Sequence, residues 1–283
     1  MRYIKYFFQF LIIITLFLIY KILGLRYSCI LSAKIFKILG PLFRSGDISH
    51  KNLITAFPEL NKIQRNAILK KMWLNYGRIF AEYLFIRDIK NSNNLIVENQ
   101  EILEKIKKES KPVIFISGHF DNFELMAMHI EKSGIDLAAI YRPLNNIFLN
   151  PIMEKIRKKY ICKKQIKKGI SGTKEMLQNF KNGSSIALMI DQRVSQGIRS
   201  NFFNKEALTT TIPAQFVKKF NTKVVPIYIE RTKNNYFKLK IYKPLEFENN
   251  DSLEKITLDL NKILEKMIIN NPDQWIWTHN RWK

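Results

Sequence analysis

The sequence predicts an α/β fold in which helices flank a mainly parallel central sheet, behind an N-terminal hydrophobic anchor helix. Two observations support this prediction. Short apolar runs typical of buried strands alternate with amphipathic helical patterns, and an uncharged apolar stretch lies near the start of the chain. No low-complexity linker or internal repeat divides the body, so we expect a membrane anchor over residues 1–25 and one domain over residues 26–283.

The composition limits the class of protein. The chain has 283 residues, and its 46% hydrophobic content excludes a disordered protein. It carries 47 Lys and Arg residues against 24 Asp and Glu, a net charge of +23, which favours an anionic partner: nucleic acid, an acidic membrane surface or an acidic protein. Its two cysteines, Cys29 and Cys162, exclude a disulfide-stapled scaffold and a Cys-rich zinc module, and they fit a reducing compartment.

The N-terminal segment is the first predicted element. Residues 6–20 carry no charge and would form a helix about 22 Å long, short of the roughly 30 Å hydrocarbon core of a bilayer. Extension past Lys21 to Leu25 reaches roughly 30 Å if Lys21 extends its amine to the headgroups. A signal peptide is disfavoured because no small-x-small cleavage site follows, and a buried core helix is the remaining alternative.

Charge predicts the orientation of this anchor. The first acidic residue is Asp47. The cations that precede it after the apolar run are Lys21, Arg26, Lys34, Lys37 and Arg44. The excess of positive charge predicts that the body lies on the cytoplasmic side of the membrane, against anionic headgroups.

The body then alternates helices and strands. Predicted helices cover 61–88, 98–109, a stretch from about 122, 171–181, 212–220 and 252–270. Predicted strands cover 112–117, 185–190, 224–230 and 237–242. The last strand alternates apolar and polar residues, which predicts one solvated face and favours an edge of the sheet.

The segment SGHFDNFEL, residues 117–125, contains the candidate catalytic pair. His119 lies just past a strand end, where α/β sheets present ligand-binding groups, and Glu124 lies five residues on, early in the next helix. A carboxylate folded back on the imidazole would fix its tautomer and leave the other nitrogen as a general base toward a hydroxyl. The structural alternative is a helix N-cap at Asp121 or Asn122 beside a histidine with ordinary hydrogen bonds.

A metal site is a second alternative for this segment. Its ligands would be His119, Asp121, Glu124 and His129. The ten residues between the two histidines, with no third histidine close by, disfavour it.

This segment resembles a known family. GHFDNFEL looks like the H-x-x-x-x-D/E motif of the lysophospholipid acyltransferase superfamily and, more narrowly, of the late acyltransferases of lipid A biosynthesis. Four further blocks resemble that family in order: IYRPLNN (140–146), MIDQ (189–192), FFNKEALTTTIPAQFVKKFNTKVVPIYIER (202–231) and PDQWIWTHNRWK (272–283). The chain departs from the family pattern at Asp121, where the family usually has Gly, and in residues 164–176, where lysines stand in place of an arginine.

The resemblance implies an acyltransferase-like fold and a reaction. The family transfers a fatty acyl chain from an acyl carrier protein thioester to a hydroxyl of a lipid A precursor, and it needs no cofactor. In that scheme His119 is the base and Glu124 orients it, while Arg142 and Asp191 bind substrate or shape the site. From the residues alone, Arg142 could equally be a solvated loop charge and Asp191 a cap after a strand.

The stretch 154–168 holds eight cations and one acid. Lys164, Lys167 and Lys168 are candidates for contact with the anionic glycolipid acceptor or with the acidic acyl carrier protein, and a solvated helix face is the alternative. Trp275 and Trp277 belong to the core or to an interfacial belt at the membrane, and their alternation on one side of an extended segment favours the core.

Three other functions remain open from the sequence. A glycerophospholipid acyltransferase acting on lysophosphatidate would use the same type of pair but favours Asp at the acid position and different downstream blocks. A nucleic-acid-binding protein is disfavoured because the cations are spread along the chain with no aromatic-interleaved platform. A non-catalytic membrane adaptor is the third.

Overall fold

The computed structural model describes residues 2–43, 46–233 and 235–283, and it confirms the α/β fold with a mainly parallel sheet. Arg44, one of the cations used to predict the orientation of the anchor, lies outside the described residues. Seven strands form the main sheet in the order β1-β9-β8-β2-β5-β3-β4. The strands are β1 (Leu95–Glu98), β2 (Ile114–Ser117), β3 (Leu137–Tyr141), β4 (Lys164–Lys167), β5 (Ser185–Met189), β8 (Val224–Arg231) and β9 (Phe237–Ile241).

All neighbours in this sheet run parallel except β8 and β9. The central strands are apolar on both faces, because helices cover both sides of a parallel sheet. In β2, for example, Ile114, Phe115 and Ile116 are all buried. Strand β9 has the predicted alternation of buried and half-exposed residues, but its predicted place at an edge is wrong, because β1 pairs with its outer side.

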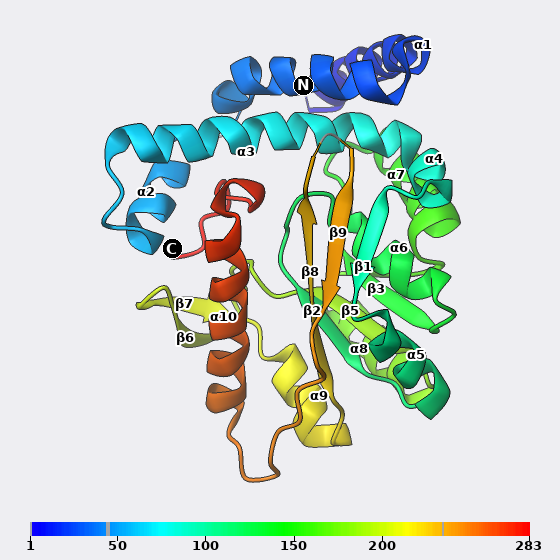
Figure 1. Ribbon diagram of the computed structural model, residues 1–283, viewed down its shortest axis with the longest axis vertical. Helices are drawn as coiled ribbons and strands as arrows, with labels where there is room; N and C mark the ends of the chain where they lie inside the picture. The colour runs from blue at the N-terminus through cyan, green and yellow to red at the C-terminus, as the bar shows by residue number, and fades with distance from the viewer. Residues whose placement is uncertain (1, 44–45, 234) are drawn as a thin grey trace.

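The predicted helices occupy the expected positions. They are α3 (Lys62–Glu82), α5 (Gln100–Glu109), α6 (Glu124–Lys132), α8 (Ile170–Lys181), α9 (Ile212–Phe220) and α10 (Leu253–Asn270). Figure 1 shows α3 lying across the ends of β8 and β9, with α10 running alongside the sheet. A capping box between Asn61 and Gln64 starts α3, which explains why this helix begins where it does.

Shorter elements complete the chain. These are α2 (Gly46–Ala56), η1 (Tyr83–Phe85), α4 (Ile86–Asn91), α7 (Asn150–Ile156), a π turn η2 (Arg157–Ile161), the antiparallel hairpin β6 (Ile198–Phe202) and β7 (Lys205–Thr209), and η3 (Pro272–Gln274). Trp275 and Trp277 in the C-terminal tail are buried in the core, as their alternation indicated. They form an edge-to-face pair with ring centroids 4.6 Å apart.

The first helix, α1 (Arg2–Phe43), is longer than the predicted anchor and is broken at Gly24. Gly24 has φ 71° and ψ 170°, a conformation that favours glycine, and it divides α1 into a first limb (2–23) and a second limb (25–43). The second limb packs on α3, where Gly77 has no side chain and so leaves room for the backbone of Ser32 and Ala33. The two limbs lie beyond α3 from the sheet (Figure 1).

Most side chains of the first limb are exposed. Among the described helices, α1 is the one long and apolar enough to cross a membrane, and only 6% of its most apolar 18-residue stretch is buried. The exposure sets this helix apart from a core helix, which would bury such a stretch.

Candidate active site

Four chemically active residues lie just past the ends of four neighbouring parallel strands. His119 follows β2, Asp191 follows β5, Arg142 follows β3 and Lys168 follows β4, and these strands are adjacent in the order β2-β5-β3-β4. Because parallel strands end at the same edge of the sheet, the fold gathers residues that are far apart in sequence. This edge is therefore where the site lies.

His119 is paired with Asp191. The distance from His119 Nδ1 to Asp191 Oδ1 is 2.8 Å, and the backbone N–H of His119 donates to Asp191 Oδ2 at 2.8 Å. The indole N–H of Trp275 donates to the same Oδ2 at 2.9 Å. With both oxygens held, the carboxylate fixes the orientation of the imidazole and leaves Nε2 on the pocket side.

Asp191 is an ionised carboxylate in this arrangement. Its side chain is fully buried, and burial alone would raise its pKa. The charge and hydrogen bonds of His119, together with the Trp275 indole, outweigh burial and hold the pKa of Asp191 well below its usual range. A buried anion next to the ring stabilises the imidazolium that forms when Nε2 takes up a proton.

The predicted contact between Glu124 and His119 is wrong. Glu124 begins α6, and its Oε1 accepts from Arg157 Nε at 2.9 Å and Nη2 at 2.5 Å, and also from the Tyr83 hydroxyl. Arg157 comes from the π turn η2 and its guanidinium lies over the Tyr141 ring, 5.5 Å from the centroid. A separation of five residues allows the Glu124 carboxylate to point toward His119 or away from it. The ion pair with Arg157 turns it away from His119. Glu124 nevertheless lines the same pocket as His119.

Asp121 is not the cap of α6. The N-cap position is Phe123, and Asp121 adopts φ 38°, a left-handed conformation that favours glycine. Asp121 Oδ1 accepts from Arg231 Nη2 at 2.9 Å and from the backbone N–H of Asn122 at 2.6 Å. The N-cap alternative for Asp121 is therefore wrong.

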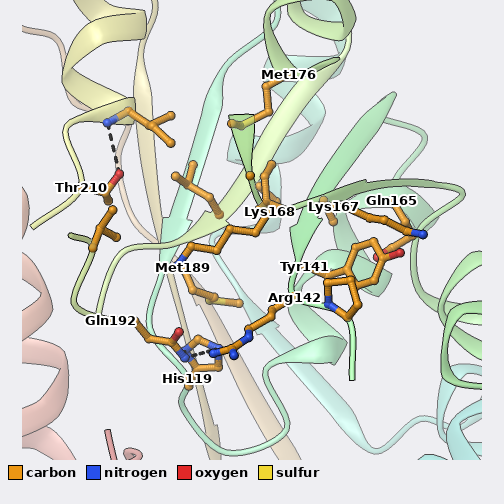
Figure 2. Close-up of a pocket in the computed structure, with 18 of the residues that line it drawn as sticks. His119, Tyr141, Arg142, Gln165, Lys167, Lys168, Met176, Met189, Gln192 and Thr210 are labelled. Carbon is orange, nitrogen blue, oxygen red and sulfur yellow. Dashed lines mark hydrogen bonds between the residues drawn. The ribbon is translucent and has the colours of Figure 1, made fainter. Parts of the chain in front are cut away.

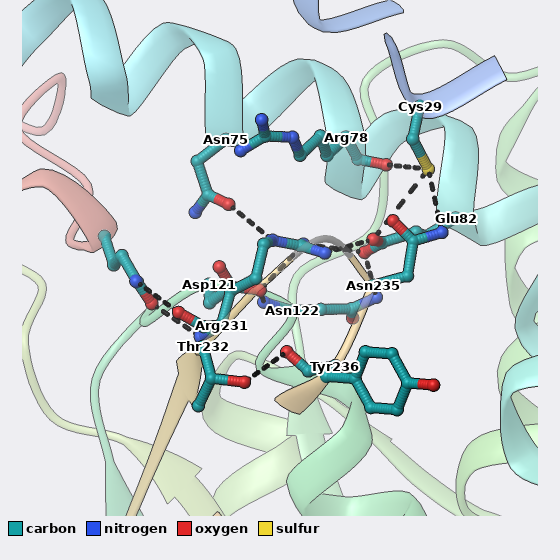
Figure 3. A network of polar contacts seen from close by, with 11 residues as sticks. Cys29, Asn75, Arg78, Glu82, Asp121, Asn122, Arg231, Thr232, Asn235 and Tyr236 are labelled. Carbon is teal, nitrogen blue, oxygen red and sulfur yellow. Dashed lines mark hydrogen bonds and ion pairs between the residues drawn. The ribbon is translucent and has the colours of Figure 1, made fainter. Parts of the chain in front are cut away.

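Arg231 connects this turn to α3. Its guanidinium donates to both carboxylate oxygens of Glu82, at 2.6 and 3.0 Å, and the Asn122 amide donates to Glu82 at 2.9 Å. Figure 3 shows Arg231 between the two carboxylates. Burial raises the pKa of Asp121 to about 6, with the charge of Arg231 opposing the rise and the charge of Glu82 adding to it. This network holds the turn that carries His119 against α3 and β8.

The pocket beside His119 has a volume of about 690 Å³. Much of its wall is apolar: Phe123, Ala127, Ala139, Ile140, Ala187, Leu188, Met189 and Met176. Arg142, Lys167 and Lys168 also line it, and Figure 2 shows Arg142 pointing toward His119. Burial and the charge of Arg142 lower the pKa of Lys168. An apolar cavity with cations beside a histidine suits a ligand that has both a hydrocarbon chain and an anionic group.

The structure separates Lys164 from the other predicted lysines. Lys164 is the first residue of β4, so it lies at the amino-terminal end of this strand, whereas Lys168 follows its carboxyl end. Its amine binds Asp136 at 2.6 Å and Ser184 at 2.9 Å. Lys164 is not among the residues that line the pocket, and its predicted contact with the acceptor or with acyl carrier protein stays a prediction. Asp191, predicted to bind substrate or to shape the site, pairs with His119.

Gln192, His279 and Arg157 line the pocket and were not singled out by sequence reasoning. Gln192 Nε2 lies 2.9 Å from His279 Nε2 and 3.3 Å from His119 Nε2. The amide thus lies between the two histidines, whose ring centroids are 6.0 Å apart. Gln192 belongs to the MIDQ block and His279 to the PDQWIWTHNRWK block. Both blocks were used as evidence for the resemblance, but neither of these two residues was assigned a role.

The four candidate metal ligands point to different partners. His129 Nε2 lies 2.7 Å from Gln100 Oε1, while Asp121, Glu124 and His119 bind Arg231, Arg157 and Asp191. Within residues 2–43, 46–233 and 235–283, no group of three or more His, Cys, Asp or Glu side chains is arranged to hold a metal ion.

Comparison with known proteins gives a consistent result over the whole chain. The sequence model of the bacterial lipid A biosynthesis acyltransferase family matches residues 1–283. The chain is 24% identical to the lipid A biosynthesis lauroyltransferase of Escherichia coli K12 over 85% of its own length and 79% of the relative. It is 24% identical to the palmitoleoyltransferase of the same strain over 90% and 84% of the two chains, and 22% identical to lipid A biosynthesis acyltransferase 2 of Shigella flexneri over 80% and 74%.

Proposed function

Because the chain belongs to the bacterial lipid A biosynthesis acyltransferase family, we propose that it transfers a fatty acyl chain from an acyl carrier protein thioester to a hydroxyl of a lipid A precursor. The observation that carries this proposal is the His119–Asp191 pair, 2.8 Å apart at the end of an apolar pocket lined by cations. This arrangement provides a base, a place for an acyl chain and groups that attract an anionic acceptor.

The mechanism follows from the fixed imidazole. His119 Nε2 takes the proton of the acceptor hydroxyl while the hydroxyl oxygen attacks the thioester carbonyl. Asp191 stabilises the imidazolium that results. When the tetrahedral intermediate collapses, the C–S bond breaks, and the imidazolium returns the proton to the departing sulfur. The products are an ester and a free thiol, and His119 is neutral again.

Glu124 acts through Arg157 in this scheme. The Glu124 carboxylate holds the Arg157 guanidinium in the pocket wall, so Glu124 is a positioning residue. Both partners are nearly buried, at 8% and 12% side-chain exposure, so loss of the carboxylate would leave a buried cation without its counter-charge. We infer that Arg157 supplies positive potential near the reacting carbonyl or the acceptor.

Arg142, Lys167 and Lys168 bind the anionic part of the acceptor. Arg142 and Lys168 lie at adjacent strand ends, close enough for the charge of one to lower the pKa of the other. Two cations placed together favour an anion between them. Phosphate groups on a glycolipid acceptor meet this requirement.

The first limb of α1 holds the enzyme at the inner membrane, with the body on the cytoplasmic side. Its exposed apolar side chains support this, and so do the cations that follow them. The acceptor and the donor would then meet at the membrane surface.

An assay with purified enzyme in detergent micelles tests the proposal. Acyl-acyl carrier protein is the donor, and a tetra-acylated lipid A precursor is compared with lysophosphatidate as the acceptor. Transfer to the glycolipid that is lost in His119→Ala supports the proposal. Transfer to lysophosphatidate alone would show a glycerophospholipid acyltransferase, and no transfer to either would refute the proposed function.

A further inference from the structure

The loop between β3 and α7 forms one wall of the pocket mouth. Arg142, Pro143, Leu144 and Asn145 line the pocket, and Leu144 and Asn145 are also exposed to solvent. The conformation of this loop therefore determines the shape of the pocket mouth and the position of Arg142.

Asparagine side chains keep this loop in one conformation. The backbone N–H of Leu144 donates to Asn150 Oδ1 at 2.8 Å. The backbone N–H groups of Phe148 and Leu149 donate to Asn146 Oδ1 at 3.0 and 3.3 Å. Such side-chain bonds replace the backbone pairing that a loop lacks.

The same loop is held by the first limb of α1. Asn146 is buried, and its Nδ2 donates to the backbone carbonyl of Tyr6 at 2.8 Å. The Phe148 ring packs against Phe7 and Phe10, with centroids 5.6 and 5.9 Å away. The Asn146 side-chain oxygen thus accepts within the loop, and its amide nitrogen donates to α1. The conformation of the loop is therefore coupled to the position of the first limb.

We propose that the first limb of α1 shapes the pocket mouth and positions Arg142, in addition to anchoring the chain. This proposal rests on the proposed function, because it assigns Arg142 to the anionic acceptor. If α1 were a passive anchor, any apolar helix in its place would serve equally well. On the proposed role, the contacts of Phe7, Phe10 and Tyr6 with the loop are needed for acceptor binding.

The contact between α1 and the loop does not include His119 or Asp191. His119 and Asp191 are held by β2, β5 and Trp275, which the loop does not include. Loosening the loop should therefore weaken acceptor binding and leave the chemical step unchanged, which appears as a rise in KM with kcat preserved.

A pair of double variants separates this role from anchoring. Phe7→Ala with Phe10→Ala removes the rings that hold Phe148. The control, Phe8→Ala with Ile12→Ala, removes apolar side chains that are 60% and 67% exposed on the same limb. Phe7→Leu with Phe10→Leu replaces the first variant if the alanine form does not fold. All are assayed in detergent micelles with equal membrane retention confirmed.

We expect the Phe7 and Phe10 variant to raise KM for the glycolipid acceptor about tenfold, equivalent to about 1.4 kcal/mol, with kcat within about twofold. Amide hydrogen exchange at Phe148 and Leu149 should become faster in this variant and stay unchanged in the control. Equal KM changes in the two variants, or unchanged exchange in both, would overturn the proposal. If the wild type transfers no acyl chain, the proposed function fails, and the exchange comparison still decides whether α1 holds the loop.

Discussion

His119 and Asp191 each lie two residues beyond a directly paired position in neighbouring strands, since Ser117 of β2 is in register with Met189 of β5. This register places two residues that are 72 positions apart within 2.8 Å of each other. The pairing of His119 with its carboxylate is therefore a property of the sheet, and the local sequence around His119 does not encode it.

The cations of the pocket should act on acceptor binding. Arg142→Ala or Lys168→Ala should raise KM for a phosphorylated glycolipid by about tenfold or more, because a charge-assisted hydrogen bond is lost. The effect on kcat should be small. Steady-state kinetics at several acceptor concentrations measures this.

Lys164→Ala is the matched control for Lys168→Ala, because Lys164 begins β4 whereas Lys168 follows the carboxyl end of that strand. Its KM should equal that of the wild type. The disadvantage of Lys168→Ala should shrink as salt rises, because screening weakens the advantage of the wild type. A KM change as large in Lys164→Ala as in Lys168→Ala would assign the effect to net charge alone.

The charge of Asp121 should make stability depend on pH. Its folded-state pKa is raised from 3.8 to about 6, so the folded protein binds a proton more readily than the unfolded chain. The cost of ionising Asp121 is absent below about pH 4 and grows as pH rises to about 6, where it approaches about 3 kcal/mol. Asp121→Asn removes that cost and keeps an oxygen to accept from Arg231.

Thermal unfolding in detergent at pH 4.5 and 7.5 tests this expectation. Asp121→Asn should gain stability relative to the wild type at pH 7.5 and about a third as much at pH 4.5. Asp259→Asn on α10, whose side chain is 39% exposed, provides the surface control and should not change the pH dependence. Parallel pH profiles for the wild type and Asp121→Asn would contradict the account of the buried network.

The membrane attachment should depend on the first limb of α1. Deleting residues 1–25 should move much of the protein from the membrane to the soluble fraction, because the exposed apolar residues of the limb are removed. The remaining basic surface should retain some protein, which high salt releases. Retention of the truncated protein at high salt would show that other parts of the chain also enter the bilayer.

The sequence predicted the elements that have long patterns. The helices α3, α8, α9 and α10 and the strands β2, β5 and β8 were found, because each has a clear apolar period or a continuous apolar run. Strands β1, β3 and β4 of the main sheet and the hairpin β6–β7 were missed. Strand β4 reads KQIK, in which a single apolar residue gives no periodic signal, and its place depends on pairing with β3.

The sequence singled out several residues that the structure brings together at one pocket, but it did not predict the contacts between them. His119, Asp191 and Arg142 were singled out because they follow a strand end or belong to the blocks of the resemblance. Lys168 was singled out because it belongs to the basic stretch 154–168. The order of the strands could not be read from the sequence, since β3 and β4 lie between β2 and β5 along the chain. Glu124 was assigned to His119 because it is near in sequence, whereas the buried Arg157 from another segment binds it.

The central claim is that Asp191, and not Glu124, is the carboxylate that works with His119. A double-mutant cycle on the acyl-transfer rate tests it most directly, with folding checked by circular dichroism. Asp191→Asn and His119→Ala should each reduce kcat by about 10²–10⁴-fold, and the double variant should be little worse than the worse single variant, because the two act as one unit. Glu124→Gln should reduce the rate through Arg157, and its effect should add to that of His119→Ala. An Asp191→Asn enzyme within about tenfold of wild type, together with non-additive Glu124 and His119 variants, would contradict the account and return the role to Glu124.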